Sequence, residues 1–151
     1  MTGVNLFELE LEHGEGDPPG YSVDHKRVGP LIGAELLGLS VYQLPPGESI
    51  CPYHYENGEE EWLIVLVGNP TVRTPEGEQE LRPWDTAFFP TGPSGAHKVT
   101  NRSDEVVRVL IWSNLVLSGT TVYPDSAKVG AWPPGKLFQL ADEVDYYAGE
   151  I

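Results

Sequence analysis

Apolar and polar residues alternate along short stretches of the chain, and turn-forming residues such as Gly, Pro, Asn and Asp separate these stretches. Alternation with a period of two is typical of a β-strand that has one buried and one exposed face. Many short strands joined by turns, without a convincing helix, indicate an all-β sandwich or barrel. The strands predicted in this way cover residues 4–11, 21–28, 34–44, 62–67, 71–74, 78–81, 86–89, 97–101 and 105–115.

The chain after residue 118 departs from this pattern because strong turn formers interrupt it. Tyr123-Pro124-Asp125 and Trp132-Pro133-Pro134-Gly135 are typical of turns rather than of regular strands. This segment is therefore predicted to be rich in loops, with one short helical turn possible near residues 141–146.

The run from Trp62 to Val67 is apolar at every position. A strand with one face in water would alternate, so both faces of this strand are predicted to be covered. Two covers remain open. A second copy of the chain could lie on this face, which predicts a homodimer, or the segment from residue 118 could fold back over it.

Composition and charge narrow the set of partners. The chain has 151 residues, 40% of them apolar, which is enough for one folded domain with a core. Its 9 basic and 23 acidic residues give a net charge of −14, and such a surface repels nucleic-acid phosphates and anionic membranes. We therefore expect a small-molecule ligand or substrate, and neither nucleic acid nor membrane as a partner.

The only cysteine is Cys51, so no disulfide can form within the chain. The N-terminal residues lack the basic and apolar pattern of a signal peptide, and no apolar run approaches the length of about 18 residues that a membrane span needs. These features predict a cytoplasmic protein.

Metal-ligating side chains gather in the middle of the chain. His54 and Glu56 lie two residues apart, so in an extended segment they point to the same face. Glu61 begins the next strand, and His97 comes from a later one. Two imidazoles and two carboxylates from three strands predict a mononuclear metal site formed by His54, Glu56, Glu61 and His97.

Other interpretations of these residues stay open. The four groups could form a hydrogen-bonded polar cluster without metal, although two buried carboxylates would repel each other unless a cation or protons neutralised them. Glu60 competes with Glu61 as the ligand. Glu61 is preferred because it shares a strand face with Leu63, Val65 and Val67, whereas Glu59 and Glu60 are expected to be solvated charges of the turn.

Two motifs resemble those of the cupin superfamily, whose members pair a Gly…His-x-His…Glu…Gly motif with a later Pro-x-Gly…His…Asn motif. The first motif is matched by Gly47, His54, Glu61 and Gly68, with Gly47 displaced by one position. The second motif is matched by Pro90, Gly92, His97 and Asn101.

The chain departs from the cupin pattern at three points. Glu56 stands where the second His of the first motif is usual, Trp84 replaces the leading Gly of the second motif, and the gap from Gly92 to His97 is stretched. The resemblance implies a double-stranded β-helix, or jelly-roll, barrel of the stand-alone cupin 2 type. It also implies a single domain over residues 1–151, with its core at about 34–115.

The donor set has consequences for the metal. Two carboxylates and two imidazoles give a neutral site with a divalent ion, and this harder set favours zinc, manganese(II) or iron(II). Four protein ligands leave two open octahedral positions, which suit bidentate binding of a hydroxycarbonyl, a diol or a carboxylate, or of substrate together with dioxygen. Glu56, if displaced from the metal, could transfer a proton.

The cupin fold hosts many activities, so the resemblance leaves function open between classes. One hypothesis is a metal-dependent lyase, isomerase or oxygenase acting on a small polar molecule. The alternative is a non-catalytic sensor or carrier of a small ligand, and a third is a dimeric barrel without a site. The candidate pocket residues are Tyr42, Phe89, Asn101 and Trp112; aromatic core packing competes for the three aromatic residues, and a strand-end structural role competes for Asn101.

Overall fold

The computed structural model describes residues 3–14 and 16–150 and consists almost entirely of antiparallel strands. The largest sheet has six strands in the order β1-β2-β3-β10-β5-β8. Its strands are β1 (Glu12–His13), β2 (Asp24–Arg27), β3 (Leu37–Leu44), β5 (Glu61–Val67), β8 (Thr86–Phe89) and β10 (Val107–Asn114). The all-β prediction is confirmed.

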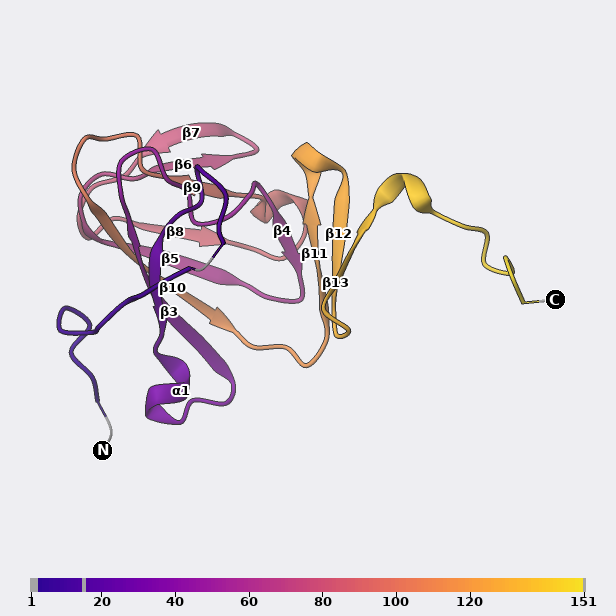
Figure 1. The fold of residues 1–151 in the computed structure, drawn as a ribbon, viewed down its shortest axis with the longest axis horizontal. Helices are drawn as coiled ribbons and strands as arrows, with labels where there is room; N and C mark the ends of the chain where they lie inside the picture. Colours follow the sequence, from indigo (N-terminus) through magenta and orange to yellow (C-terminus); the bar gives the residue numbers. More distant parts are fainter. Residues whose placement is uncertain (1–2, 15, 151) are drawn as a thin grey trace.

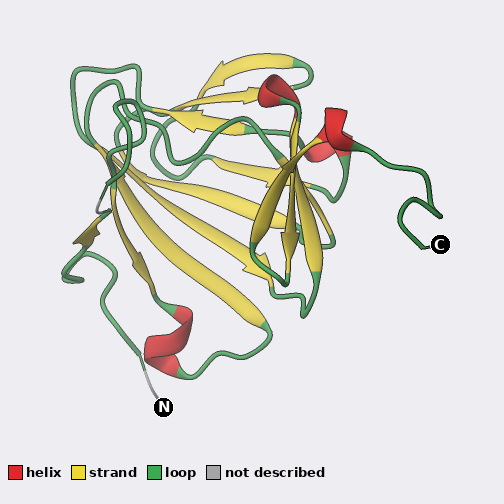
Figure 2. Ribbon diagram, turned by 45° about the vertical axis from the view of Figure 1, so that its right-hand side comes forward, coloured by secondary structure: helices red, strands yellow, loops and turns green. Residues whose placement is uncertain are grey.

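Two smaller sheets complete a jelly-roll barrel (Figure 1). A three-stranded sheet in the order β7-β6-β9 consists of β6 (Thr71–Thr74), β7 (Gly77–Glu80) and β9 (Lys98–Thr100). A four-stranded sheet in the order β13-β12-β11-β4 consists of β4 (Tyr55–Asn57), β11 (Gly119–Tyr123), β12 (Lys128–Trp132) and β13 (Lys136–Gln139). Figure 2 shows this last sheet standing at one end of the long strands.

The main core lies between the six-stranded and three-stranded sheets. Because strand residues alternate between faces, Leu63 and Val65 of β5 point inward with Val107 and Val109 of β10, and all four are fully buried. Val72 of β6 closes the cluster from the opposite side. This core holds the long strands rigidly against each other, and the candidate site lies at their ends.

A second apolar cluster covers part of the outer face of the large sheet. Val28, Val41 and Leu110 are buried there, and Leu6, Leu9 and Leu11 of the N-terminal segment pack against them, together with Ile64 and Leu66 of β5. The prediction of a strand over residues 4–11 is therefore wrong, because these leucines cover a sheet face instead of pairing with a strand. The N-terminal segment, and not the segment after residue 118, supplies this cover.

The loop-rich segment after residue 118 contains three strands that were not predicted. β11, β12 and β13 pair in sequence, and β11 pairs with β4 as well. The prolines that indicated turns lie between these strands, where they end each strand without preventing the next. The expected helical turn is a short 3₁₀ turn at Leu140–Asp142, and an unpredicted helix, α1, occupies Gly29–Ile32.

No helix in the described parts of the chain is both long and apolar enough to cross a membrane. Beyond the 3₁₀ turn, the last described residues lead away from the barrel with their side chains exposed (Figure 1).

Candidate metal centre

A backbone bridge holds two imidazoles side by side. His54 lies just before β4 and His97 just before β9, and the two residues form an isolated antiparallel pair. The N–H of His54 donates to the carbonyl of His97 at 3.1 Å, and the N–H of His97 donates to the carbonyl of His54 at 2.8 Å. The two ring centroids are consequently only 4.7 Å apart.

Glu61 brings a carboxylate to the same point. It is the first residue of β5, and its Oε2 lies 3.4 Å from Nε2 of His97. One ligand atom from each of His54, Glu61 and His97 lies within 4.8 Å of the other two. His54 and His97 are only 8% and 4% exposed. The structure thus gathers three of the four predicted ligands into one buried group.

Hydrogen bonds to the backbone fix the tautomers of both imidazoles. Nδ1 of His54 lies 3.0 Å from the carbonyl oxygen of Pro52, and Nδ1 of His97 lies 2.9 Å from the carbonyl oxygen of Gly95. A carbonyl oxygen can only accept, so each Nδ1 carries the proton and donates it. The Nε2 lone pair of each ring is left free, which is the arrangement that metal-ligating histidines require.

Burial makes the charged states of these groups unfavourable. It raises the pKa of Glu61 to about 7, helped by the nearby carboxylates of Glu56 and Glu59. It lowers the pKa of His97 to about 3, with His54 adding to the effect, and it lowers the pKa of His54 as well. Neutral imidazoles and a destabilised carboxylate are what a divalent cation would find favourable, since it compensates the negative charge.

The fourth predicted ligand, Glu56, is held slightly apart from this group. Its Oε1 lies 3.9 Å from Nε2 of His54, but its two oxygens lie 2.9 and 2.8 Å from the hydroxyl of Thr121, which donates to one of them. Nε1–H of Trp132 donates to the same hydroxyl at 2.8 Å and fixes its orientation. Burial raises the pKa of Glu56, and the Thr121 hydrogen bond opposes this shift.

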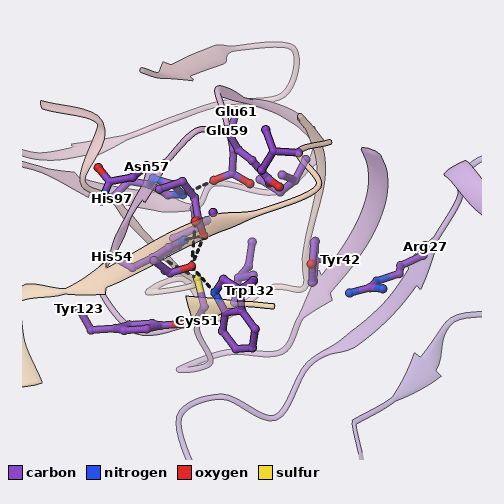
Figure 3. A pocket seen from close by; sticks show the side chains of 17 residues that line it. Arg27, Tyr42, Cys51, His54, Asn57, Glu59, Glu61, His97, Tyr123 and Trp132 are labelled. Atoms are coloured by element: carbon purple, nitrogen blue, oxygen red, sulfur yellow. Dashed lines mark hydrogen bonds and ion pairs between the residues drawn. The ribbon is translucent and has the colours of Figure 1, made fainter. Parts of the chain in front are cut away.

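These groups line a cavity of about 460 Å³ (Figure 3). Tyr42, a candidate pocket residue from the sequence, lies in its wall. Phe89 lies outside the lining and stacks on the ring of His97 at 3.7 Å between centroids, so it packs behind the ligand. Trp112 does not line the cavity, because it points to the outer face of the large sheet and is 44% exposed.

Asn101 is also outside the cavity and is fully buried. Its side-chain amide donates to the carbonyls of Leu44 and Glu105 at 2.9 and 2.7 Å. Its carbonyl oxygen accepts from the N–H and the hydroxyl of Ser103 at 3.0 and 2.7 Å. Asn101 therefore ties the end of β3 to the turn before β10, which is the structural role that competed with a pocket role.

Several lining residues were not identified from the sequence. Glu59 was expected to be solvated, yet it is half-buried in the cavity wall, and burial raises its pKa. Thr121, Tyr123 and Trp132 also line the cavity, and they lie in the segment that was predicted to be rich in loops. The β-branched and aromatic run Thr120-Thr121-Val122-Tyr123 was the signal that could have revealed β11.

Comparisons with known proteins agree with this fold. A family model described as the cupin domain matches residues 40–113. A structure from Acidithiobacillus ferrooxidans, provisionally described as a sugar phosphate isomerase, is 25% identical; the match covers 96% of this chain and 94% of that one, with a TM-score of 0.84. No curated protein sequence matches the chain.

Two further structures show the same fold at lower identity. A protein from Silicibacter pomeroyi, described as a sugar phosphate isomerase of the cupin superfamily, is 22% identical, with 96% and 98% of the two chains covered and a TM-score of 0.83. The polyketide cyclase RemF from Streptomyces resistomycificus is 21% identical, with 76% and 79% covered and a TM-score of 0.63.

Proposed function

We propose that this chain, which belongs to the cupin superfamily, binds one divalent metal and is an enzyme that moves a proton within a small hydroxycarbonyl compound. The observation that carries this proposal is the convergence of His54, Glu61 and His97, with both Nε2 lone pairs free and the three ligand atoms within 4.8 Å of one another. The similarity to a protein provisionally described as a sugar phosphate isomerase supports the isomerase class.

The residues fit a metal by the chemistry of their donor atoms. Two neutral imidazoles and one carboxylate suit zinc, manganese(II) or iron(II), and three protein ligands leave positions for a substrate. The sequence predicts Glu56 as a fourth ligand; its Oε1 lies 3.9 Å from Nε2 of His54, but it is not part of the group formed by His54, Glu61 and His97, so we place it beside the metal and not on it. When bound, such an ion supplies Lewis acidity that polarises a carbonyl group.

We assign proton transfer to Glu56. Thr121, itself held by Trp132, fixes its carboxylate at the cavity wall, so its position is defined. Burial raises its pKa, which brings it toward the range in which a carboxylate both accepts and returns a proton near neutral pH. An isomerisation between adjacent carbons needs one such group.

The test is deuterium exchange at carbon. The metal-loaded protein is incubated in D2O with a panel of small hydroxyaldehydes and hydroxyketones, with and without a phosphate group, and proton NMR follows exchange next to the carbonyl. Glu56→Gln is expected to retain the metal and to lose about 100-fold or more of the exchange rate. Glu60→Gln, which changes an exposed carboxylate nearby, is the control. Exchange by Glu56→Gln at the wild-type rate would remove Glu56 from the mechanism.

Two other functions remain as outcomes of the same experiment. Two histidines and one carboxylate also form the ligand set of iron(II) oxygenases, so oxygen uptake without carbon exchange would favour that class. Ligands that raise the melting temperature but undergo neither reaction in any metal state would favour a sensor or carrier.

We also propose a homodimer formed through the outer face of β8, β5 and β10. Phe88, Trp62 and Trp112 are cross-strand neighbours there, and they are 44%, 45% and 44% exposed. Three adjacent half-exposed aromatic residues are unusual on a free surface. Light scattering should therefore give twice the chain mass.

Trp62→Glu is expected to convert this dimer to a monomer without loss of metal. Leu31→Glu is the control: Leu31 lies on α1 and is 46% exposed, close to the value for Trp62, and its substitution should leave the mass unchanged. A monomeric wild-type protein at micromolar concentration contradicts the proposal.

A further inference from the structure

A second cavity, of about 650 Å³, adjoins the metal cavity. The two share four wall residues, namely Arg27, Tyr42, Ile50 and Cys51. A molecule bound at the metal centre could therefore extend past these residues into the second cavity, and the chemistry of the second cavity bears on what that molecule is.

The second cavity is basic, although the chain as a whole is strongly acidic. Arg27, Lys98 and Lys128 line it, three of only 9 lysines and arginines in a chain of net charge −14. Asp17 and Asp125 are the carboxylates of its wall, and Asp125 is engaged by Arg73 in two hydrogen bonds of 2.6 and 3.0 Å. A local cluster of positive charge of this kind favours the binding of an anionic ligand.

Arg27 is the residue that both cavities share and that carries charge. It ends β2, and its side chain is exposed and aims toward Tyr42 (Figure 3). Within the described part of the chain its guanidinium has no hydrogen-bond or ion-pair partner, whereas Arg73 and Arg102 pair with carboxylates. A guanidinium presents five donors in a planar fork, so Arg27 is free to bind an oxyanion on two sides.

Each of the two lysines contacts an aromatic ring, and neither forms an ion pair with a carboxylate of the described residues, although Lys98 is near enough to Asp125 to help lower the pKa of that carboxyl group. Nζ of Lys98 lies 3.3 Å from the hydroxyl of Tyr21 and 5.0 Å from its ring centroid. Nζ of Lys128 lies 5.6 Å from the ring centroid of Tyr123, which itself lines the metal cavity. These contacts position each ammonium group while leaving most of its donors available.

We infer that the substrate carries a phosphate group, which Arg27, Lys98 and Lys128 bind in the basic cavity. A phosphate monoester has close to two negative charges and three acceptor oxygens, which match three cations better than the single charge of a carboxylate does. The reacting hydroxycarbonyl end would lie at the metal centre. That placement rests on the proposed function, whereas the phosphate site rests on the cations alone.

Titration calorimetry with inorganic phosphate on chelator-treated protein tests this inference without the metal. Arg27→Gln is expected to weaken phosphate binding by about tenfold or more, because a hydrogen-bonded ion pair is lost. Lys128→Gln gives a second, independent reduction. Arg82→Gln removes the same charge from an exposed residue that lines neither cavity, so it should bind phosphate like the wild type.

The outcomes separate this inference from the proposed function. Absence of saturable phosphate binding overturns the phosphate site. A parallel metal titration of the same protein shows whether the proposed metal centre binds its ion even when phosphate does not bind. An Arg82→Gln effect as large as that of Arg27→Gln overturns the inference as well, since only net charge would then matter. Acetate that binds as tightly as phosphate overturns the assignment of the ligand as a phosphate.

Discussion

The Glu61→Gln variant is expected to bind a divalent metal roughly 100- to 1000-fold more weakly than the wild-type protein. Glutamine keeps the size of the side chain but removes its charge and one of its two strong donor oxygens. A structural metal in proteins is worth about 10–16 kcal/mol over four ligands, so one ligand contributes about 2.5–4 kcal/mol, which is close to the free energy of this loss. Competition with a chelator of known affinity measures the effect.

The metal affinity of the wild-type protein should depend on pH through the carboxyl group of Glu61. Because the pKa of Glu61 is raised to about 7 in the metal-free fold, binding below that pH must displace a proton. Wild-type affinity should therefore fall about tenfold for each pH unit below 7, while the weak affinity of Glu61→Gln should depend less on pH. The exposed neighbour Glu60, changed to Gln, should leave both affinity and pH profile unchanged.

Without metal, the same substitution should stabilise the fold. A carboxyl group with a folded pKa of about 7 and an ordinary value of 4.5 contributes stability below pH 4.5 that is lost as the pH rises through 7. At pH 8 metal-free Glu61→Gln should therefore be more stable than wild type by about 3 kcal/mol, and the difference should fall below about 1 kcal/mol at pH 5. Urea unfolding in the presence of a chelator measures this difference. If Glu61→Gln were less stable than wild type at both pH values, the claim that burial destabilises the Glu61 carboxylate would be contradicted.

Gly95→Ala is expected to reduce both folding stability and metal binding. A Cβ at Gly95 would lie 1.7 Å from the carbonyl oxygen of Pro90 and 2.8 Å from its carbonyl carbon, both backbone atoms that cannot turn aside. The 3₁₀ turn at Pro93–Gly95 would have to shift, and the carbonyl of Gly95 orients the ring of His97. We expect a loss of about 3 kcal/mol or more in unfolding free energy, together with a loss of at least tenfold in metal affinity.

Ser94→Ala, in the same turn but exposed, is the matched control and should behave like the wild type in both measurements. Urea unfolding and chelator competition on the two variants therefore separate a local steric effect from a general sensitivity of the turn. If Gly95→Ala were as stable as Ser94→Ala, the close approach of residues 90 and 95 would be refuted.

Strands with strong apolar signals and the hairpin of β6 and β7 around Pro75-Glu76-Gly77 were predictable from the sequence, whereas the strands after residue 118 were not. Residues 86–89 were predicted with the bounds of β8, and β3, β5 and β10 lie within or within one residue of their predicted runs. β11 and β12 are short and are flanked by proline-containing turns, so local sequence suggested loop. The leucines of residues 4–11 alternate well enough to resemble a strand. They instead pack on the apolar outer face of the large sheet, which cannot be foreseen from the local sequence.

The part of the candidate site that consists of motif residues was predictable from the sequence. His54, Glu61 and His97 meet because a barrel brings their strand ends together, and the motif positions carry that information. The placement of Glu56 depends on Thr121, which is distant in sequence and reaches it through pairing of β4 with β11. Contacts of this kind between remote residues leave no local pattern. The single domain over residues 1–151 and the cytoplasmic location stay predictions.

Anomalous diffraction from crystals of the metal-loaded protein tests the central claim most directly. The account predicts one strong peak per chain at the absorption edge of the bound metal, within coordination distance of Nε2 of His54, Nε2 of His97 and a carboxylate oxygen of Glu61. A fully loaded crystal with no peak among these three side chains, or with its metal bound at another place, would contradict it.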